Sequence, residues 1–382
     1  MPRPLRAPFP FTETEGIELH CRAERTWERM LEDLRSAKRR ILFENYILRD
    51  GIACEQVLEA LLEAAGRGVR VRVLADAFGS MDLSGRSQAR MREAGVELRF
   101  FNPIRLQALL GGGSLGRLLQ RTHRRIVVVD DRAGWVGGLA VDDQWHPEGE
   151  GPTARDTMLR LSGPRFVEQL AERFARLWNW RWMGLPVLEG RLRPVPADPP
   201  MGWSRLVPQY ARRGPHFRRT LYHRLAHARR RAWLATAYFI PNRRLRASLR
   251  AAAKRGVSVR LLLPGRRIDH PVVRIASHRY YSQLLRTGIR IFEYQTAFLH
   301  EKVALFDEEW SLVGSPNLDR WSLYLNNELA VETRCTRLAR DLEEQFLVDF
   351  GESEEILWEE WRKRPRWARF LEEVLGILEP AL

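Results

Sequence analysis

The chain has 382 residues, a net charge of +15 at pH 7 and a pI near 10.5. This length is enough for two domains of ordinary size, and the charge, carried mostly by arginine, favours anionic partners such as lipid headgroups, nucleic acid or phosphate-bearing substrates. The three cysteines have no ligand spacing, which argues against a disulfide scaffold or a zinc site and suits a reducing compartment.

No stretch of the sequence approaches the roughly 18–20 continuous apolar residues of a membrane-spanning helix. The opening residues, Met1 to Arg6, are followed by no apolar run, so we expect no secretory signal. If the protein works on lipid, it must therefore act from the membrane surface.

Helical and strand-like segments alternate along the first half of the chain. The hydrophobic pattern predicts helices over residues 24–39, 53–66 and 85–95, and apolar strands over 40–47, 69–75 and 96–101. A hairpin at 126–138 and a helix at 164–182 follow. Strands that alternate with helices indicate α/β layers around a largely buried sheet.

The second half repeats this order. We expect helices over 217–231, 243–256 and 272–288, strands over 232–240, 257–263 and 289–294, a hairpin at 303–315 and a helix at 336–350. A seam with several prolines at 183–214 separates the halves, and we place the boundary near residue 190. The sequence therefore predicts an α/β protein of two similar lobes, residues 1–190 and 191–382.

Each hairpin begins with the same arrangement of chemistry. His123 is followed two positions later by Arg125, and His300 is followed two positions later by Lys302. Because residues two apart on a strand share a face, each imidazole and its cation point the same way. Two such stretches in register, one per half, suggest a duplicated catalytic half-site.

The rest of each hairpin also matches its counterpart. Asp130 and Asp307 come seven positions after the histidines and read as turn residues. The return strands bring the residues seventeen positions after the histidines opposite them. In the second half this residue is Asn317, an amide, and in the first half it is Ala140, which cannot donate a hydrogen bond.

This pattern resembles the signature of the phospholipase D superfamily, in which H-x-K-x4-D is followed by G-[GS]-x-N. Residues 314–322 and 326–328 of the second half, and the stretches 44–47 and 237–241, are similar to bacterial cardiolipin synthases without transmembrane helices. The tail from Phe346 onward also resembles that branch. The resemblance covers nearly the whole chain and implies a pseudo-twofold active site between two lobes with mixed sheets.

The resemblance implies that both histidines face one phosphate and exchange its alcohols without a metal or a cofactor. One histidine attacks phosphorus and forms a phosphohistidine, while the other protonates the departing alcohol and deprotonates the incoming one. We assign His123 as the nucleophile and His300 as the acid and base, although a near-symmetric site does not disclose the order. We expect Arg125 and Lys302 to bind the phosphate oxygens.

Four further residues are expected to support the phosphate or the imidazoles. Ser315 and Asn317 would add hydrogen bonds to the phosphate. Glu328 is expected to hold the imidazole of His300, and Asp156 is the matching carboxylate of the first half; such contacts fix the tautomer of an imidazole and stabilise its charged form. The two turn aspartates, part of the motif, are expected to fix the hairpins and to do little chemistry.

The leading interpretation is a cardiolipin-synthase-like phosphatidyltransferase, peripheral on the cytoplasmic face of the bacterial inner membrane. Its partners would be an anionic membrane surface, a phospholipid donor and an alcohol-bearing lipid acceptor, with no nucleic acid. The alternatives are a phospholipase D-type phosphodiesterase, either a lipid hydrolase or a nuclease, and a degenerate membrane-binding homologue.

Residues 103–121, just before His123, mix leucine and arginine with a run of glycines. Such a segment can place apolar side chains among lipid headgroups while its arginines contact phosphates. A flexible loop with a partly buried leucine face is an equally good interpretation of the same residues.

Overall fold

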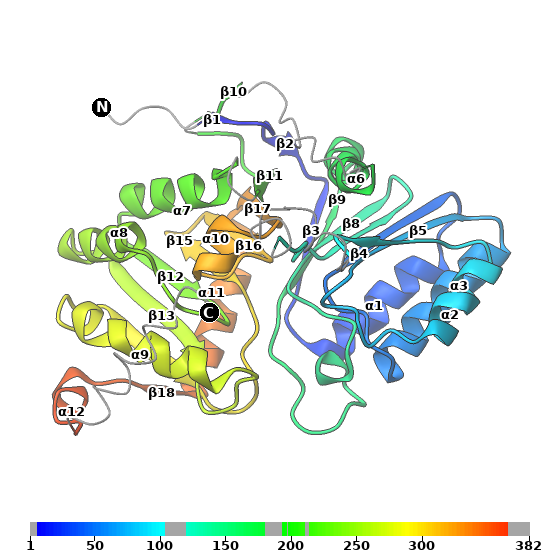
Figure 1. Cartoon of the computed structure of the whole chain (residues 1–382). Helices are drawn as coiled ribbons and strands as arrows, with labels where there is room; N and C mark the ends of the chain where they lie inside the picture. Colours follow the sequence, from blue (N-terminus) through cyan, green and yellow to red (C-terminus); the bar gives the residue numbers. More distant parts are fainter. Residues whose placement is uncertain (1–5, 104–119, 180–192, 197, 211–213, 366–382) are drawn as a thin grey trace, which may run out of the picture.

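The computed structural model describes residues 6–103, 120–179, 193–196, 198–210 and 214–365. Two lobes, each built on a mixed β-sheet with helices packed against it, lie side by side (Figure 1). The predicted fold class is therefore confirmed. Most of the segment 103–121, the expected boundary near residue 190 and the end of the C-terminal tail lie outside the described residues.

The first lobe contains a seven-stranded sheet in the order β3-β9-β8-β7-β4-β5-β6. Its strands are β3 (Gly16–His20), β4 (Arg40–Asn45), β5 (Arg70–Asp76), β6 (Glu97–Phe101), β7 (Ile126–Val129), β8 (Ala133–Gly137) and β9 (Met158–Ser162). The strands β4, β5 and β6 run parallel, whereas β7, β8, β9 and β3 are antiparallel. The helices α1 (Ala23–Arg35), α2 (Ile52–Gly66) and α3 (Gly85–Glu93) cover its outer face, and a short 3-10 helix, η1 (Asp143–Trp145), follows β8 (Figure 1).

The second lobe contains a nine-stranded sheet in the order β18-β14-β13-β12-β15-β16-β17-β11-β2. Its strands are β2 (Thr12–Glu13), β11 (Trp203–Gln209), β12 (Arg231–Ala235), β13 (Ser258–Pro264), β14 (Arg290–Tyr294), β15 (Val303–Phe306), β16 (Trp310–Gly314), β17 (Glu328–Arg334) and β18 (Ser353–Glu355). The helices are α7 (His216–His227), α8 (Arg243–Lys254), α9 (Pro271–Leu285), α10 (Arg320–Tyr324), α11 (Thr336–Gly351) and α12 (Trp358–Trp361). A separate two-stranded sheet pairs β1 (Arg6–Ala7) with β10 (Arg193–Pro194).

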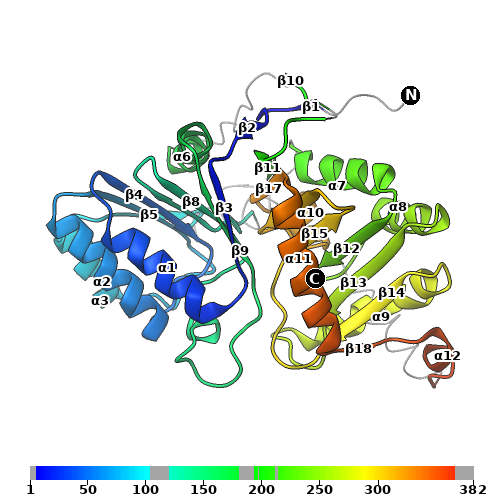
Figure 2. The ribbon, with the colours of Figure 1, turned by 180° about the vertical axis from the view of Figure 1, so that it is seen from behind.

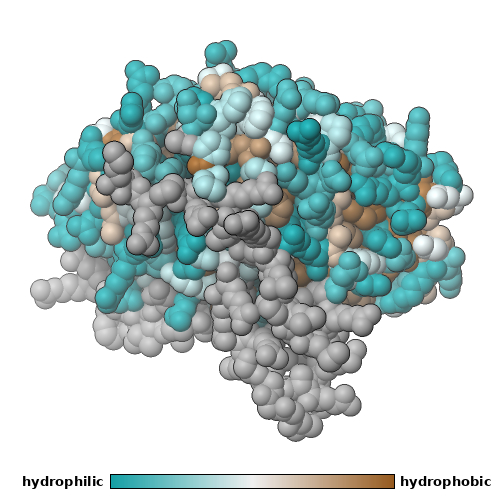
Figure 3. Space-filling view, turned by 90° about the horizontal axis from the view of Figure 1, so that it is seen from above, coloured by the Kyte–Doolittle hydropathy of each residue, from teal (hydrophilic) through white to brown (hydrophobic). Residues whose placement is uncertain are grey.

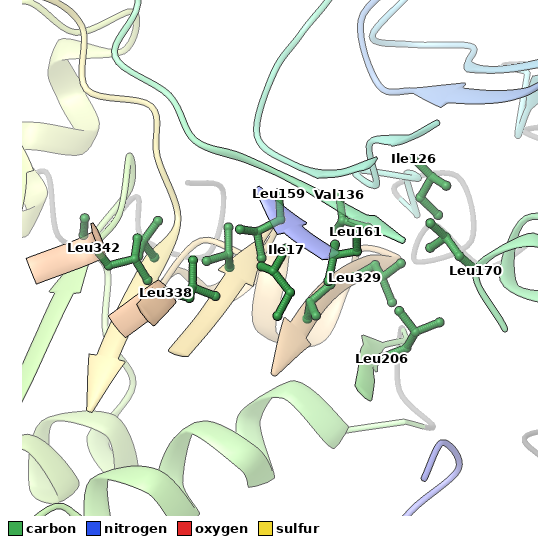
Figure 4. Packing of buried hydrophobic residues seen from close by; sticks show 14 of the residues in the cluster. Ile17, Ile126, Val136, Leu159, Leu161, Leu170, Leu206, Leu329, Leu338 and Leu342 are labelled. Carbon is green, nitrogen blue, oxygen red and sulfur yellow. The ribbon is translucent and has the colours of Figure 1, made fainter. Parts of the chain in front are cut away.

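A single apolar core joins the lobes. In Figure 4, Val136 and Leu159 of the first sheet lie beside Leu329 of the second, and all three are fully buried. The helix α6 (Pro164–Trp178) contributes Leu170 to this core, and α11 contributes Leu338. Because the two sheets share this packed interior, they hold residues at their junction in fixed relative positions.

The helix α11 also reaches across to the first lobe. Figure 2 shows it beside β3, and the Nη2 of Arg337 donates a 2.7 Å hydrogen bond to the carbonyl oxygen of Ile17. The surface seen in Figure 3 is mainly hydrophilic over the described residues, as expected for a chain of this charge. Among the described residues, no helix has the length and apolar composition needed to cross a bilayer.

The predicted helices and central strands agree with the structure to within a few residues at most ends. The main exception is the strand predicted over 232–240, because β12 ends at Ala235 and the chain then leaves the sheet. The strands β3, β9, β11 and β17 were not predicted. The strand β11 lies within the expected seam at 183–214, where no strand was predicted, and it pairs with β17 of the second lobe.

Candidate active site

Each histidine is placed by a backbone hydrogen bond to the other lobe. The amide N–H of His123 donates to the carbonyl oxygen of Asn327 at 2.9 Å, and the amide N–H of His300 donates to that of Arg155 at 2.8 Å. These contacts belong to two short parallel bridges between the lobes. The structure therefore brings the two predicted histidines to one junction, as the motif duplication required.

The carboxylates that hold the imidazoles are exchanged between the lobes. The Nδ1 of His123 lies 3.0 Å from Glu328, and the Nδ1 of His300 lies 2.6 Å from Asp156. The expectation that Glu328 holds His300 was wrong. Each backbone bridge ends at the residue before a carboxylate, so the carboxylate that follows the bridge meets the histidine of the opposite lobe.

The two motif cations occupy equivalent positions. The Nη1 of Arg125 donates to the carbonyl oxygen of His123 at 2.7 Å, and the Nζ of Lys302 donates to the carbonyl oxygen of His300. Both side chains are buried. Within the described residues, the Nε of Arg125 is buried without a hydrogen-bond partner, so one donor of the guanidinium is available to a ligand.

Burial shapes the protonation of the site. It lowers the pKa of His300 to about 3, holds the pKa of His123 well below its usual value and lowers the pKa of Lys302 to about 7. Burial also raises the pKa of Glu328 to about 7. Burial alone would raise the pKa of Asp156, but the neighbouring His300 and Lys302 outweigh it and hold that pKa below its usual value. The two carboxyl groups therefore differ, because Asp156 stays ionised at neutral pH whereas Glu328 is near its midpoint.

Ser315 serves the carboxylate of its own lobe. Its hydroxyl donates to Glu328 at 2.5 Å and accepts from the amide N–H of Leu329 at 3.1 Å. The matching position in the first lobe is Gly138, where a Cβ atom would lie only 2.1 Å from an oxygen of Asp156. Both small residues thus leave room for a carboxylate, and the hydroxyl that we expected on the phosphate is engaged with Glu328.

The amide at position 317 has no equivalent at position 140. Asn317 is buried and accepts a 3.4 Å hydrogen bond from the hydroxyl of Thr236. The strand registers place Asn45 of the first lobe at the position equivalent to Thr236. The side-chain amide of Asn45 donates to the carbonyl oxygen of Leu139 at 3.1 Å, next to the fully buried Ala140. In the first lobe, the amide side chain therefore belongs to Asn45, on the segment that faces residue 140, and it is hydrogen-bonded to the backbone.

The two motif aspartates fix the hairpins, as expected. Asp130 accepts hydrogen bonds of 2.8–3.0 Å from the backbone N–H groups of residues 38–40, and Asp307 accepts bonds of 2.8–3.2 Å from those of residues 229–231. Both have positive φ angles, 55° and 51°, which aspartate tolerates in turns. They lie beyond β7 and β15 from the histidines, and their contacts are structural.

Two aromatic residues beside the imidazoles were given no role by the sequence analysis. The ring of Tyr46 lies edge-on to that of His123 with centroids 4.9 Å apart, and the ring of Trp145 lies edge-on to that of His300 at 4.8 Å. The indole N–H of Trp145 donates to Asp156 at 2.9 Å. Tyr46 stands in one of the family-like stretches, but the motif spacing gives no signal for Trp145.

Comparisons with known proteins agree with this geometry. A family model described as "Cardiolipin synthase, PLD-like domain" matches residues 30–178 and 221–349. Cardiolipin synthase A of Pseudomonas aeruginosa is 34% identical over 385 residues, which cover 98% of this chain and 74% of the relative. Cardiolipin synthase of Geobacillus kaustophilus is 32% identical over 373 residues, which cover 94% and 71% of the two chains.

Two solved structures share the fold. Phosphatidylserine synthase of Haemophilus influenzae superposes with a TM-score of 0.75 at 14% identity, covering 97% of this chain and 96% of that one. Polyphosphate kinase of Porphyromonas gingivalis superposes with a TM-score of 0.57 at 16% identity, covering 86% and 49%. At these identities the likeness concerns the fold alone.

Proposed function

The chain belongs to the cardiolipin synthase family of phospholipase D-like proteins and is a phosphatidyltransferase, and we propose that it passes a phosphatidyl group from a phospholipid such as phosphatidylglycerol to a second lipid with a free alcohol. The observation that carries this proposal is the junction of two histidines, each held by a carboxylate of the opposite lobe. This arrangement supports the proposal because two imidazoles at one junction would be able to act on a single phosphate, as double displacement at phosphorus requires.

In the first step, the Nε2 of His123 attacks phosphorus, the bond from phosphorus to the headgroup oxygen breaks, and His300 gives its proton to that oxygen. In the second step, His300 takes a proton from the acceptor alcohol, whose oxygen attacks the phosphohistidine and releases His123. Each step forms one bond to phosphorus and breaks one, so the lipid phosphodiester is restored.

The asymmetry between the carboxyl groups supports this order of roles. An acid must carry an imidazolium. Burial lowers the pKa of His300 to about 3 in the free site, so its protonated form depends on the ionised Asp156 beside it and on the negative charge of a bound phosphate, both of which raise that pKa. A nucleophile must be neutral. Burial and the nearby cations hold the pKa of His123 well below its usual value, and its partner Glu328 has a pKa of about 7.

The positive side chains supply the charge that a phosphate transition state needs. Arg125 and Lys302 flank the junction from the two lobes. The Nε of Arg125 has no hydrogen-bond partner among the described residues, so its N–H could donate to a phosphate oxygen. Asn317 would add a neutral donor from the second lobe only. A bound phosphate would also offset the cost of burying these cations, because it places negative charge beside them.

Membrane binding follows from the substrate. Both donor and acceptor are lipids, so the site must meet the bilayer surface, and the net charge of +15 favours anionic headgroups. We propose peripheral association with the cytoplasmic face of the bacterial inner membrane, the side on which a reducing environment suits the three free cysteines.

The proposal is tested by expressing the protein in a bacterial strain that lacks its own cardiolipin synthases, followed by lipid extraction and mass spectrometry. His123→Ala and His300→Ala serve as controls. Cardiolipin or another phosphatidyl-exchanged lipid that forms only with the parent chain would support transfer and identify the acceptor. Phosphatidic acid alone would indicate a hydrolase, and unchanged lipids with the protein expressed would contradict the proposal.

A further inference from the structure

A second basic site lies on the second lobe, and its lining includes neither catalytic histidine. A surface cavity of about 890 Å³ is bounded by residues of α7, α8, α9 and α10. Figure 1 shows where these helices lie in the second lobe. Five arginines line it: Arg218, Arg243, Arg246, Arg279 and Arg320. A concentration of guanidinium groups around one cavity is a common means of recognising phosphate.

Among the described residues, few acidic groups face the arginines of this cavity. Four of its arginines, all except Arg279, form no ion pair within the described part of the chain, whereas Arg124 at the lobe junction pairs with Glu44 at 2.6 Å. The carboxyl group among the described lining residues is that of Asp319, which accepts the amide N–H of Ser322 at 2.7 Å as the cap of α10. Burial raises the pKa of Asp319 to about 7, so this group is only partly ionised at neutral pH.

Two of the guanidinium groups are stacked on aromatic rings, and each has an N–H donor without a hydrogen-bond partner among the described residues. That of Arg218 lies over the ring of Tyr324 at 3.9 Å, and that of Arg246 lies over the ring of Tyr280 at 4.6 Å. Within the described residues, the Nε atoms of both arginines are buried without a hydrogen-bond partner. Stacking orients the planar groups in advance, so that less side-chain freedom is lost when an anion binds.

The remaining lining favours a lipid over other phosphate compounds. Leu325, which is only partly buried, gives the cavity an apolar component beside its arginines, and the buried Ile240 and Leu323 lie beneath it. A glycerophospholipid headgroup presents both kinds of surface, since its charged phosphate adjoins the glycerol and the start of the acyl chains. The cavity also borders the catalytic region, because a single residue, Leu318, separates Asn317 from Asp319.

We propose that this cavity binds the phosphodiester headgroup of an anionic phospholipid that is not the one under attack at the paired histidines. The inference rests on the proposed function, because it assumes that the protein works at an anionic bilayer. A lipid held there would fix the second lobe on the membrane with the catalytic junction beside it.

The test compares two double variants that change the net charge equally. Arg243→Glu with Arg320→Glu removes two exposed arginines of the cavity, and each is the first residue of its helix, where glutamate is favourable. The matched control is Arg86→Glu with Arg92→Glu, two exposed positions of α3 in the first lobe. Thermal melts of both variants establish that the fold is retained.

Binding is measured by co-sedimentation of the full chain with phosphatidylcholine vesicles, with and without phosphatidylglycerol. We expect the parent and the control to prefer the vesicles with phosphatidylglycerol, and the cavity variant to bind them about thirtyfold more weakly. Equal losses in both double variants, or a parent chain with no preference for phosphatidylglycerol, would overturn the proposal. The assay is repeated with the His300→Ala substitution added to each protein, so that vesicle binding is measured without conversion of the lipid.

Discussion

The Nδ1 of His300 lies 2.6 Å from Asp156, a carboxylate of the opposite lobe. The reciprocal contact joins His123 to Glu328 at 3.0 Å. Neither lobe therefore contains a complete half-site, because each supplies an imidazole to one pair and a carboxylate to the other. The apolar core between the sheets has a direct catalytic consequence, since it sets the distance between the partners of each pair.

The exchanged pairing can be measured as a coupling free energy. We expect His300→Ala and Asp156→Asn to be coupled by about 1.5–3 kcal/mol in the free energy of unfolding, the range for hydrogen bonds to charged groups. His300→Ala and Glu328→Gln should be additive within about 0.5 kcal/mol. Urea titration of the single and double variants gives both values. Strong coupling of His300 to Glu328 instead would indicate pairing within one lobe.

The two carboxylates should affect stability in opposite directions. The pKa of Asp156 is lowered in the folded chain, so its ionised form stabilises the fold above the usual pKa, and Asp156→Asn should destabilise the protein at pH 8. The pKa of Glu328 is raised to about 7, so its ionised form is unfavourable at pH 8, and Glu328→Gln should stabilise the protein. The rise in the pKa of Glu328 from 4.5 to about 7 corresponds to a stabilisation of about 3 kcal/mol at pH 8 on Glu328→Gln, measured by thermal or urea unfolding. A destabilised Glu328→Gln would contradict this account.

Activity should be confined to a narrow pH range. In the free enzyme, kcat/KM should fall below about pH 7 as Glu328 gains a proton, and above about pH 7 as Lys302 loses one. Lys302→Arg should move the alkaline limb to higher pH, because a guanidinium keeps its charge, and should leave the acid limb in place. Profiles of kcat/KM against pH for both enzymes test this, and identical alkaline limbs would exclude Lys302 as the group responsible.

The amide missing from the first lobe can be restored only with its neighbour. Ala140 is fully buried, so Ala140→Asn alone should overpack the site and destabilise the fold by about 1–3 kcal/mol. Adding Asn45→Thr reproduces the Thr236 and Asn317 pair of the second lobe and should recover at least half of that loss. We expect transfer by the double variant to equal or exceed that of the parent. If the effects of the two substitutions on the free energy of unfolding add fully, the side chains at positions 45 and 140 are not in contact.

The sequence was sufficient to predict the α/β lobes and the duplicated motif whose two histidines the structure brings to one junction. Duplicated spacing in register identified His123 and His300, and the alternation of apolar strands with helices predicted the central part of each sheet. Local periodicity carries this information because side chains alternate along a strand. The hairpin roles of Asp130 and Asp307 also followed from local turn chemistry.

The partners across the junction could not be predicted in the same way. Glu328 lies closer in sequence to His300 than to His123, and only the packing of the lobes shows that the opposite lobe supplies its partner. The strand β11 was missed because Pro208 and Arg205 interrupt its apolar pattern. In the structure Arg205 is fully buried and pairs with Glu332 at 2.5 Å, a long-range contact that leaves no local signal.

The most direct test of the central claim is to locate the covalent intermediate. Purified protein is mixed with labelled phosphatidylglycerol, quenched in alkali and digested, and the phosphatidyl adduct is mapped by mass spectrometry, with His123→Ala as the control. The account predicts an adduct on the peptide that carries His123, absent from the control. An adduct on His300 alone would reverse the assigned roles, and transfer without any histidine adduct would contradict the mechanism.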